Sequence, residues 1–494
     1  MNRALTRISL AALVMFVLLL ININYVQGFQ SSTLAGEPEN TRAFSQQFLI
    51  RRGAIYATGD GGNTVIAESR LAKNGNGKYQ RFYPAGPTYA PVTGYDSVFG
   101  KTGIEEADNK YLTGTASSLG LHNFISLITG KPTQGSSVSL TISPKAQKAA
   151  YQALLSDGGH EGGVVAINPS TGAILAMASS PTFDPNAFAT LDTAKLAKVS
   201  KRENAAKNNP LLSRATGVTS PPGSTFKIIT SSAAFSTHAV ANPQTTVPAP
   251  TNLSLKNGHF LINDDNGPCA NGHPPIIQAF WLSCNTAFGA LGMRLGGATL
   301  HKYANLYGFN DAHLNVPIPV TPSVVPKSEA APAFEAFTAI GQFSDTVTPF
   351  QEAMIAATVA NHGTLMTPYL VQRIQAPDES TIQSATPVPL SHPVTPTVAG
   401  DLTQMMIQVT QNPAGTAFAT ANKTVTGGIE IAGKTGTAQN GINNTDLNDA
   451  VFTCFAPAGN PKIAVGVIVR GGGFGAAAAA PIAVKVIQAF LGKS

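Results

Sequence analysis

The sequence predicts an α+β protein of several domains, in which a β-rich N-terminal domain separates an apolar membrane-type segment from a larger mixed domain. The chain has 494 residues, more than one hydrophobic core usually organises. An apolar run opens it, and a pattern of short strands and turns gives way near Ser137 to alternating strands and helices. We therefore expect an anchor at residues 1–29, a pedestal domain at 30–135 and the main domain at 136–494.

The N-terminal segment has the features of a membrane signal. Arg3 and Arg7 precede an uncharged run from Leu10 to Ile21, and the apolar character continues to Val26. The run is shorter than the roughly 20 residues that span a bilayer, and a cleavable signal peptide has a similar apolar region. Both alternatives stay open, with an uncleaved anchor favoured because no typical cleavage site follows closely. The basic residues before the run predict a single-pass protein of the cell membrane, with its bulk outside the cytoplasm.

Composition excludes some classes of function. The net charge of +6 comes without a dense basic block or a nucleic-acid-binding motif, so we expect no nucleic-acid partner. Cys269, Cys284 and Cys454 are too few for a disulfide framework and have no metal-ligand spacing, so no metal site is predicted. A bridge between Cys269 and Cys284 and a free buried thiol stay as alternatives.

Local patterns predict several elements. Gly, Pro and Asn clusters such as Gly59 to Asn63 break residues 30–135 into short strands. Periodicity and turn residues after them predict a strand at Val138 to Ile142, a helix at Pro144 to Leu155 and a hairpin of Gly163 to Ile167 with Ala173 to Ala178. An alanine-rich loop at 476–480 is expected to lead into a C-terminal helix at Ile482 to Leu491.

The first motif with chemical potential is Pro-Pro-Gly-Ser-Thr-Phe-Lys at residues 221–227, followed by a helix-compatible apolar stretch. Ser224 is expected at the N-terminus of that helix, where backbone N–H groups and the dipole stabilise a developing anion. Lys227 follows on the same face and can take the serine proton if burial or a second cation lowers its pKa. Alone, such a sequence is usually a helix cap with an exposed lysine.

The second motif is Ser283-Cys284-Asn285. Its hydroxyl and carboxamide can point into one cleft, where the hydroxyl relays a proton and the amide orients an acyl chain. A single tripeptide of this kind is also an ordinary turn between helices.

The third motif is Lys434-Thr435-Gly436-Thr437, preceded by an apolar run from Ile429 that predicts a strand leading into it. The lysine and the hydroxyls offer a cation and donors to a carboxylate, and the glycine lets a substrate backbone approach closely. An edge strand protected by its lysine is the alternative for one isolated copy.

Together, S-x-x-K, S-x-N and K-T-G in this order are the signature of the serine penicillin-recognising enzymes. The sequence resembles the monofunctional, class B penicillin-binding proteins, of the penicillin-binding protein A type. Phe452 departs from the pattern, since relatives often carry tryptophan there. The resemblance runs over nearly the whole chain and includes residues 51–55, 100–105, 181–186, 341–342 and 348–349. It implies a transpeptidase domain whose antiparallel sheet is covered by helices on both faces.

The resemblance also implies roles. Ser224 attacks the carbonyl of the penultimate D-alanine of a stem peptide, with Lys227 as the general base, and the backbone N–H groups of Ser224 and Thr437 form the oxyanion hole. Ser283 passes the proton to the departing D-alanine amine, and Asn285 holds Lys227 and the substrate amide. No cofactor is implied.

The substrate-binding residues implied by the resemblance are on the K-T-G strand. Lys434, Thr435 and Thr437 clamp the terminal carboxylate, and Gly436 completes this set. The implied partners are peptidoglycan stem peptides, the lipid-linked precursor, β-lactam antibiotics, the membrane through the N-terminal helix and proteins of the cell-wall synthesis machinery.

The fate of the acyl-enzyme separates rival functions. Hydrolytic relatives use a glutamate in an E-x-x-L-N-like segment, and none of the glutamates between the second and third motifs has that setting: Glu329, Glu335, Glu352, Glu379 and Glu430. We expect slow hydrolysis and trapping by β-lactams. The alternatives are a β-lactam-hydrolysing or sensing relative, which turnover of a chromogenic cephalosporin would reveal, and a non-catalytic scaffold, which a complementing Ser224→Ala variant would reveal.

Overall fold

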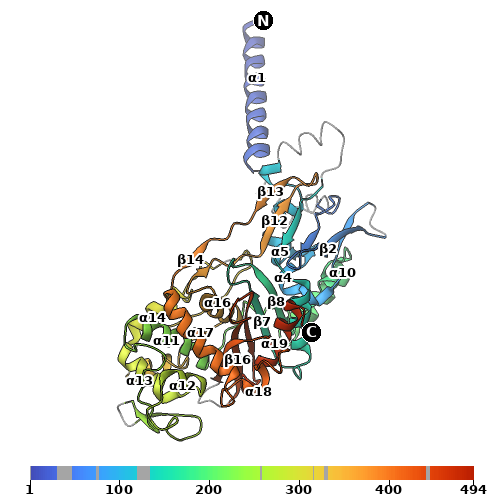
Figure 1. Cartoon of the computed structure of the whole chain (residues 1–494). Helices are drawn as coiled ribbons and strands as arrows, with labels where there is room; N and C mark the ends of the chain where they lie inside the picture. The colour runs from blue at the N-terminus through green and yellow to red at the C-terminus, as the bar shows by residue number, and fades with distance from the viewer. Residues whose placement is uncertain are drawn as a thin grey trace.

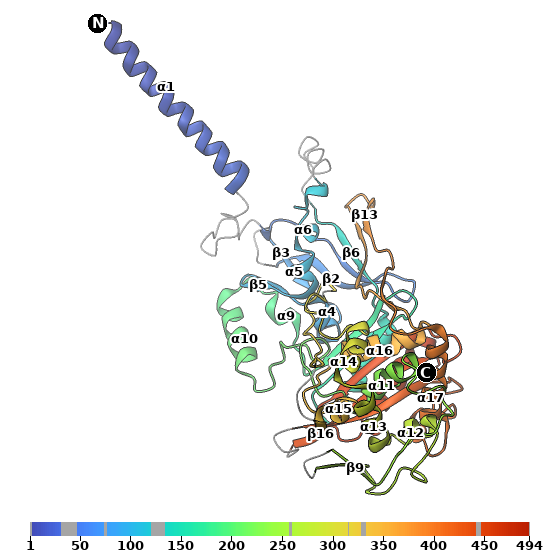
Figure 2. The same ribbon diagram turned by 90° about the vertical axis from the view of Figure 1, so that its left-hand side faces the viewer.

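The computed structural model shows two large sheets, helices around the larger one, and a separate N-terminal helix (Figures 1 and 2). It describes residues 2–30, 47–73, 77–119, 134–255, 259–314, 316–327, 332–440 and 446–493. Glu329, one of the glutamates between the second and third motifs, lies outside these residues, as do parts of the predicted pedestal range.

The N-terminal helix α1 (Asn2–Tyr25), followed by the π-helical turn η1 (Val26–Gln30), stands clear of the body in both views (Figures 1 and 2). Its segment Leu5–Tyr25 has a mean hydropathy of 2.2, is long and apolar enough to cross a membrane, and is unburied within the described chain. Asn24 fits in the helix because its amide donates to the Leu20 carbonyl at 2.8 Å. A signal sequence has the same properties, so the choice between anchor and signal stays a prediction.

One sheet is named the smaller sheet because its six strands are mostly short, and it has the strand order β13-β12-β6-β1-β2-β3. Strands β1 and β6 are parallel, and the other neighbours are antiparallel. The sheet combines strands from both sides of the predicted boundary near residue 136, and the boundary itself stays a prediction. The strands are β1 (Ile55–Ala57), β2 (Thr64–Leu71), β3 (Tyr79–Phe82), β6 (Ser137–Leu140), β12 (Val371–Gln375) and β13 (Thr381–Ser384).

Short elements beside this sheet enclose a buried ion cluster. Glu105 is fully buried, and its two oxygens lie 2.7 Å from Arg52 and 2.6 Å from Arg81. Asp96 lies 3.4 Å from Arg52 and 3.1 Å from Lys101, so two carboxylates face two guanidiniums and one ammonium. The short elements of this region are η2 (Gly86–Tyr89), α4 (Ala90–Thr93), β4 (Asp96–Ser97), β5 (Gly100–Lys101), α5 (Gly103–Ala107), α6 (Asn109–Leu112) and η3 (Ser117–Leu119).

The larger sheet is antiparallel throughout, with the order β15-β16-β17-β7-β8. The predicted hairpin is confirmed by β7 and β8, which pair across the turn that ends at Gly172. Every residue of β7, β8 and β17 is buried, as expected for a sheet covered on both faces. The strands are β7 (Gly162–Ile167), β8 (Ile174–Ser180), β15 (Ala432–Asn440), β16 (Asp446–Ala456) and β17 (Ile463–Val469).

Helices cover the two faces of the larger sheet (Figure 1). Helices α8 (Pro144–Leu155) and α19 (Ala479–Leu491) pack together on one face, and α16 (Pro349–Ala360) packs on the other. The prediction for α8 is confirmed, with Ser143 as its N-cap. The C-terminal helix begins at Ala479, before the predicted Ile482, because alanine favours helix and Pro481 falls in the first turn.

The remaining helices and strands flank the two sheets. These elements are α9 (Pro185–Phe188), α10 (Thr193–Ala205), η4 (Gly223–Phe226), α11 (Lys227–Ser236), β9 (Asn252–Ser254), β10 (Phe260–Ile262), α12 (Ile276–Trp281), α13 (Asn285–Leu295), α14 (Gly297–Leu306), α15 (Pro332–Thr338), β11 (Leu365–Met366), β14 (Pro389–Ser391), α17 (Pro396–Gln411) and α18 (Phe418–Ala421). Two of these helices, α9 and α10, lie beside the short N-terminal elements, where α9 contacts η2 and β4 (Figure 2).

Candidate active site

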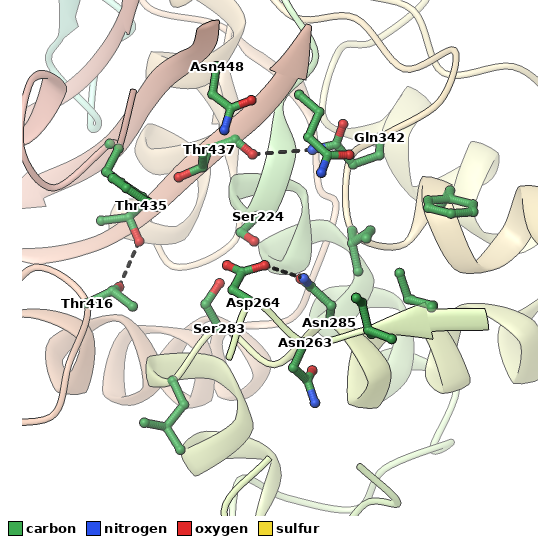
Figure 3. A pocket seen from close by; sticks show the side chains of 18 of the residues that line it. Ser224, Asn263, Asp264, Ser283, Asn285, Gln342, Thr416, Thr435, Thr437 and Asn448 are labelled. Carbon is green, nitrogen blue, oxygen red and sulfur yellow. Dashed lines mark hydrogen bonds between the residues drawn. The ribbon is translucent and has the colours of Figure 1, made fainter. Parts of the chain in front are cut away.

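A cleft of about 880 Å³ lies beside β15, where the three sequence motifs meet (Figure 3). Predicted site residues from all three motifs line it. Those residues are Ser224, Ser283, Asn285, Thr435 and Thr437.

Ser224 lies on the 3-10 turn η4, which leads directly into α11, so its predicted place at a helix N-terminus is confirmed. Gly223 before it has φ 57°, and a Cβ atom there would lie 2.8 Å from the carbonyl oxygen of Thr437. Glycine therefore lets the serine turn lie directly against β15. Ser224 itself is half-buried and faces the cleft.

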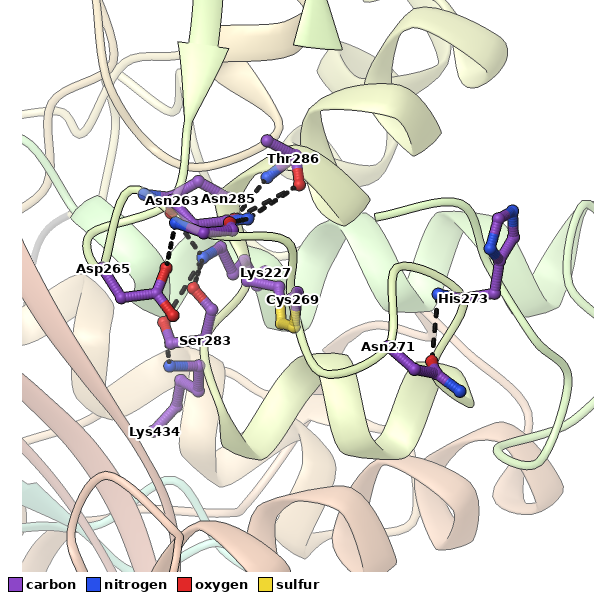
Figure 4. Close-up of a disulfide and its surroundings, with 12 residues drawn as sticks. Lys227, Asn263, Asp265, Cys269, Asn271, His273, Ser283, Asn285, Thr286 and Lys434 are labelled. Carbon is purple, nitrogen blue, oxygen red and sulfur yellow. Dashed lines mark hydrogen bonds between the residues drawn. A yellow bond between two sulfur atoms is a disulfide. The ribbon is translucent and has the colours of Figure 1, made fainter. Parts of the chain in front are cut away.

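Lys227 is fully buried at the start of α11 and points to the second motif (Figure 4). Its Nζ donates to the Ser283 carbonyl at 2.7 Å and to Oδ1 of Asn285 at 2.8 Å, and it lies 3.3 Å from the Ser283 hydroxyl. A neutral amine has two hydrogens, which the two short bonds use. In this neutral form its lone pair faces the Ser283 hydroxyl at 3.3 Å.

Ser283 joins the two lysines. Its hydroxyl accepts from Lys434 Nζ at 3.0 Å while it contacts Lys227, and Lys434 also donates to the Thr435 carbonyl at 3.0 Å. Ser283 adopts the left-handed conformation with φ 63°, which a non-glycine residue rarely adopts. This turn between α12 and α13 directs both the carbonyl and the hydroxyl of Ser283 to Lys227.

The electrostatics of the two lysines favour loss of a proton. Burial, followed by the neighbouring Lys434 ammonium, holds the pKa of Lys227 well below 10.5. Burial lowers the pKa of Lys434 to about 7. The Asp264 carboxylate opposes both shifts, since it raises the pKa of each lysine.

The third motif lies within β15. The strand that leads into it begins at Ala432, three residues after the start of the predicted run at Ile429. Thr437 lines the cleft, but Gly436 does not belong to its described lining. A Cβ atom on Gly436 would lie 2.6 Å from the Pro222 carbonyl, so the close neighbour of this glycine is the serine turn.

Three further residues support the cleft and were not predicted as site residues. Thr416 shares a hydrogen bond of 2.7 Å with the Thr435 hydroxyl, and the Gln342 amide donates to the Thr437 carbonyl at 3.3 Å (Figure 3). Asp264 accepts from the Asn285 amide at 2.9 Å. Gln342 belongs to a segment that carried the family resemblance, whereas Thr416 and Asp264 lie in turns without a recognisable motif.

A buried carboxyl lies behind the nucleophile. Glu352 on α16 is 2.7 Å from the Thr225 hydroxyl, which is also 2.8 Å from the Pro222 carbonyl. Burial raises the pKa of Glu352 to about 8. One hydroxyl hydrogen cannot serve two acceptors, so protonated Glu352 donates to Thr225, which donates to Pro222.

Of the two alternatives for Cys269 and Cys284, a bridge or free buried thiols, the structure has the bridge. Cys269 and Cys284 are bonded, and Cys454 is a buried free thiol. The bridge ties the loop after β10 to the middle residue of the second motif (Figure 4). Within the described ranges, no group of three or more His, Cys, Asp or Glu residues could hold a metal ion.

Comparison with known proteins identifies the family. Residues 162–488 match the penicillin binding protein transpeptidase domain, and residues 52–138 match the penicillin binding protein A dimerisation domain. The chain belongs to the penicillin-binding proteins with a transpeptidase domain. A relative named peptidoglycan D,D-transpeptidase PbpA from Mycolicibacterium smegmatis is 38% identical over 99% of both chains. The protein of the same name from Mycobacterium tuberculosis is 36% identical, also over 99% of both chains.

Solved structures of penicillin-binding proteins share the fold. Penicillin-binding protein A from M. tuberculosis, in a ceftriaxone acyl-enzyme complex, is similar with a TM-score of 0.82 and 34% identity, covering 90% of this chain and 100% of that chain. Its penicillin G acyl-enzyme complex is similar with a TM-score of 0.82 and 35% identity, covering the same shares of the two chains. The expected class B penicillin-binding protein fold is thereby confirmed.

Proposed function

We propose that this chain is a peptidoglycan D,D-transpeptidase that cross-links stem peptides through an acyl-enzyme on Ser224. The observation that carries the proposal is the shared contact of Lys227 and Lys434 with the Ser283 hydroxyl, in the cleft that Ser224 lines. The printed name of the M. smegmatis relative and the β-lactam acyl-enzymes of the M. tuberculosis structures support it.

Acylation starts with the transfer of the Ser224 proton to neutral Lys227, while Ser224 Oγ attacks the carbonyl of the penultimate D-alanine. The backbone N–H groups of Ser224 and Thr437 stabilise the oxyanion, each by roughly 10² to 10³ in rate. Ser283 then passes the proton from Lys227 to the departing D-alanine nitrogen as the peptide C–N bond breaks. Asn285 holds Lys227 in place through its carboxamide oxygen.

Substrate binding depends on the K-T-G strand. The positive charge of Lys434 and the hydroxyls of Thr435 and Thr437 receive the terminal carboxylate of the donor peptide, or the carboxylate of a β-lactam. Thr416 orients the Thr435 hydroxyl, because the two share a hydrogen bond.

The acyl-enzyme reacts with an amine in preference to water. Asp264 is the carboxylate in the described lining of the cleft, and no described glutamate lines it. Glu352 lies behind Thr225, and Glu430 pairs with Lys423 at 2.7 Å. The amine of a second stem peptide therefore attacks the ester carbonyl and forms the cross-link. Lys227 takes the proton of this amine and returns it to the Ser224 oxygen as the ester bond breaks.

The site requires an extracytoplasmic polymer as substrate, which agrees with the apolar helix α1. We place the protein in the cell membrane with one span and with the catalytic domain outside the cytoplasm. Its partners are stem peptides, the lipid-linked precursor and proteins of the cell-wall synthesis machinery.

A reconstitution with two peptides tests the proposal. The full chain in detergent is incubated with a donor that ends in D-Ala-D-Ala and an acceptor that carries a free amine, and both products are quantified by mass spectrometry. We expect equal amounts of free D-alanine and cross-linked peptide. Ser224→Ala should yield neither, whereas Ser200→Ala, a serine on α10, should behave as the wild type.

Three results would contradict the proposal. Cross-linking by the Ser224→Ala variant would exclude the serine mechanism. Release of D-alanine without cross-links would indicate a hydrolase, and rapid turnover of a chromogenic cephalosporin would indicate the β-lactam-hydrolysing alternative.

A further inference from the structure

Asp264 is the charged residue in the described lining of the cleft, where Figure 3 shows it near Ser224 and Ser283. It follows β10 and is exposed to the cleft. Its Oδ1 accepts a hydrogen bond of 2.9 Å from Nδ2 of Asn285. A carboxylate therefore contacts the machinery of the reaction directly.

The loop that carries Asp264 is attached at three consecutive residues, the last two of the second motif and the residue that follows them. Cys284 is bonded to Cys269, and the backbone N–H of Thr286 donates to Asn263 at 3.0 Å (Figure 4). Between them, Asn285 donates to Asp264 (Figure 3). These attachments on both sides of Asp264 fix its place relative to Asn285.

The contact determines which way the Asn285 carboxamide faces. An amide presents a carbonyl oxygen on one side and N–H donors on the other. The oxygen of Asn285 accepts from Lys227 at 2.8 Å, and its nitrogen donates to Asp264. Rotation of the amide by 180° would place two oxygens against each other at Asp264 and two N–H groups against each other at Lys227.

Asp264 also acts on the charges below the cleft. The charged groups that face it among the described residues are Lys227 from α11 and Lys434 from β15, with Asp265 beside it in the loop. Its carboxylate raises the pKa of both lysines, against the effect of burial.

We propose that Asp264 is a positioning residue of this active site: it orients the Asn285 carboxamide toward Lys227 and supplies the negative charge that the two lysines share. This inference rests on the proposed transpeptidase function and adds a fourth element, the loop after β10, to its three motifs.

The direction of the effect on the reaction follows from the roles of the lysines. Lys227 must be neutral to accept the serine proton, so its pKa sets the acid limb of the rate profile. Lys434 must be charged to hold the carboxylate, so its pKa sets the alkaline limb. Loss of the Asp264 charge lowers both pKa values, and both limbs move to lower pH.

The test is the pH dependence of the second-order rate of acylation by a fluorescent penicillin. Asp264→Asn keeps an acceptor for Asn285 but removes the charge, so both limbs should move down by on the order of half to one pH unit. Asp264→Ala also releases the carboxamide and should lower the maximum rate at least tenfold. Asp264→Glu should return the limbs toward their original pH.

Asp265→Asn is the matched control, because Asp265 is the adjacent aspartate and does not belong to the described lining of the cleft. Its profile should coincide with that of the wild type. If wild-type Ser224 is acylated but the pH profile of Asp264→Asn is not shifted, the Asp264 inference alone is overturned. An equal shift of the profile in Asp265→Asn has the same consequence. Absence of wild-type acylation overturns the proposed function and this inference together.

Discussion

Two buried lysines can share one serine hydroxyl only if their positive charges are reduced. Lys227 and Lys434 both contact Ser283, and neither side chain is exposed. Burial lowers the pKa of each, which favours a neutral lysine amine as the base of a site without histidine. The same burial brings the pKa of Lys434 to about 7, so this residue gains or loses its charge with modest changes in its surroundings.

Protonation of Glu352 is expected to make stability depend on pH. The pKa of the carboxyl is near 4.5 when exposed and about 8 in the folded protein. Its contribution to the free energy of unfolding is therefore fully present below pH 4.5 and is lost as the pH rises toward 8. The loss is on the order of 1.4 kcal/mol for each pH unit in this window. Glu352→Gln keeps a donor for Thr225 and removes the ionisation, so it should be more stable relative to wild type at pH 8 than at pH 5.

Urea unfolding at both pH values measures this effect. Glu379→Gln, at an exposed carboxyl, is the control and should show no such change. An equal difference between wild type and Glu352→Gln at pH 5 and pH 8 would contradict a protonated Glu352.

The sequence predicted the site residues that belong to ordered motifs, and missed those that contribute through a single contact. Ser224, Lys227 and Ser283 have residue types and an order that indicate their chemistry. Asp264 lies in an Asn-Asp-Asp-Asn turn, and Glu352 lies in a helix beside a Thr-Pro signal. Nothing local shows that one faces Asn285 and the other Thr225, because those contacts arise from packing of distant segments.

At the level of elements, the loop after β10 depends on its covalent attachment. The disulfide between Cys269 and Cys284 closes a loop with a sequence separation of 15 residues. A disulfide that closes a loop of this length stabilises the folded protein by about 3 kcal/mol, because it restricts the unfolded chain. We expect the Cys269→Ser/Cys284→Ser double variant to be less stable by about this amount in urea unfolding.

Reductant provides the control for this prediction. It should lower the stability of the wild type to that of the double variant, and it should leave the double variant, which retains Cys454, unchanged. Equal effects of reductant on both proteins would contradict a structural disulfide.

The ion cluster of the N-terminal region should be sensitive to loss of its central carboxylate. Glu105→Gln leaves Arg52 and Arg81 buried without their main counter-charge, which costs about 3 to 5 kcal/mol. We expect a clear decrease in melting temperature. The control Glu68→Gln breaks an exposed pair with Arg70 and should cost less than about 1 kcal/mol. Similar decreases in both variants would contradict this account of the cluster.

Elements formed by neighbouring residues were predictable, whereas those completed by distant strands were not. The β7–β8 hairpin and helix α8 follow from local periodicity, turn residues and the Ser143 cap. The smaller sheet is completed by β12 and β13, which lie more than two hundred residues after β6 in the sequence. No local pattern specifies which sheet such strands join.

At the scale of the whole molecule, α1 is separate from the body that holds the cleft. Its segment Leu5–Tyr25 has no buried share within the described chain, so the body does not depend on it for packing. We expect removal of residues 1–30 to give a protein that leaves the membrane fraction and is acylated by penicillin at a rate within twofold of the full chain. Retention in the membrane fraction, or loss of acylation, would contradict this separation.

The central claim is that three distant motifs form one acylation site around Ser224. The most direct measurement is intact-mass analysis of the full chain after exposure to penicillin G, followed by peptide mapping of the adduct. The account predicts one penicilloyl group per chain, located on Ser224, and no adduct on Ser224→Ala. An unmodified wild-type protein, or an adduct on another residue, would contradict it.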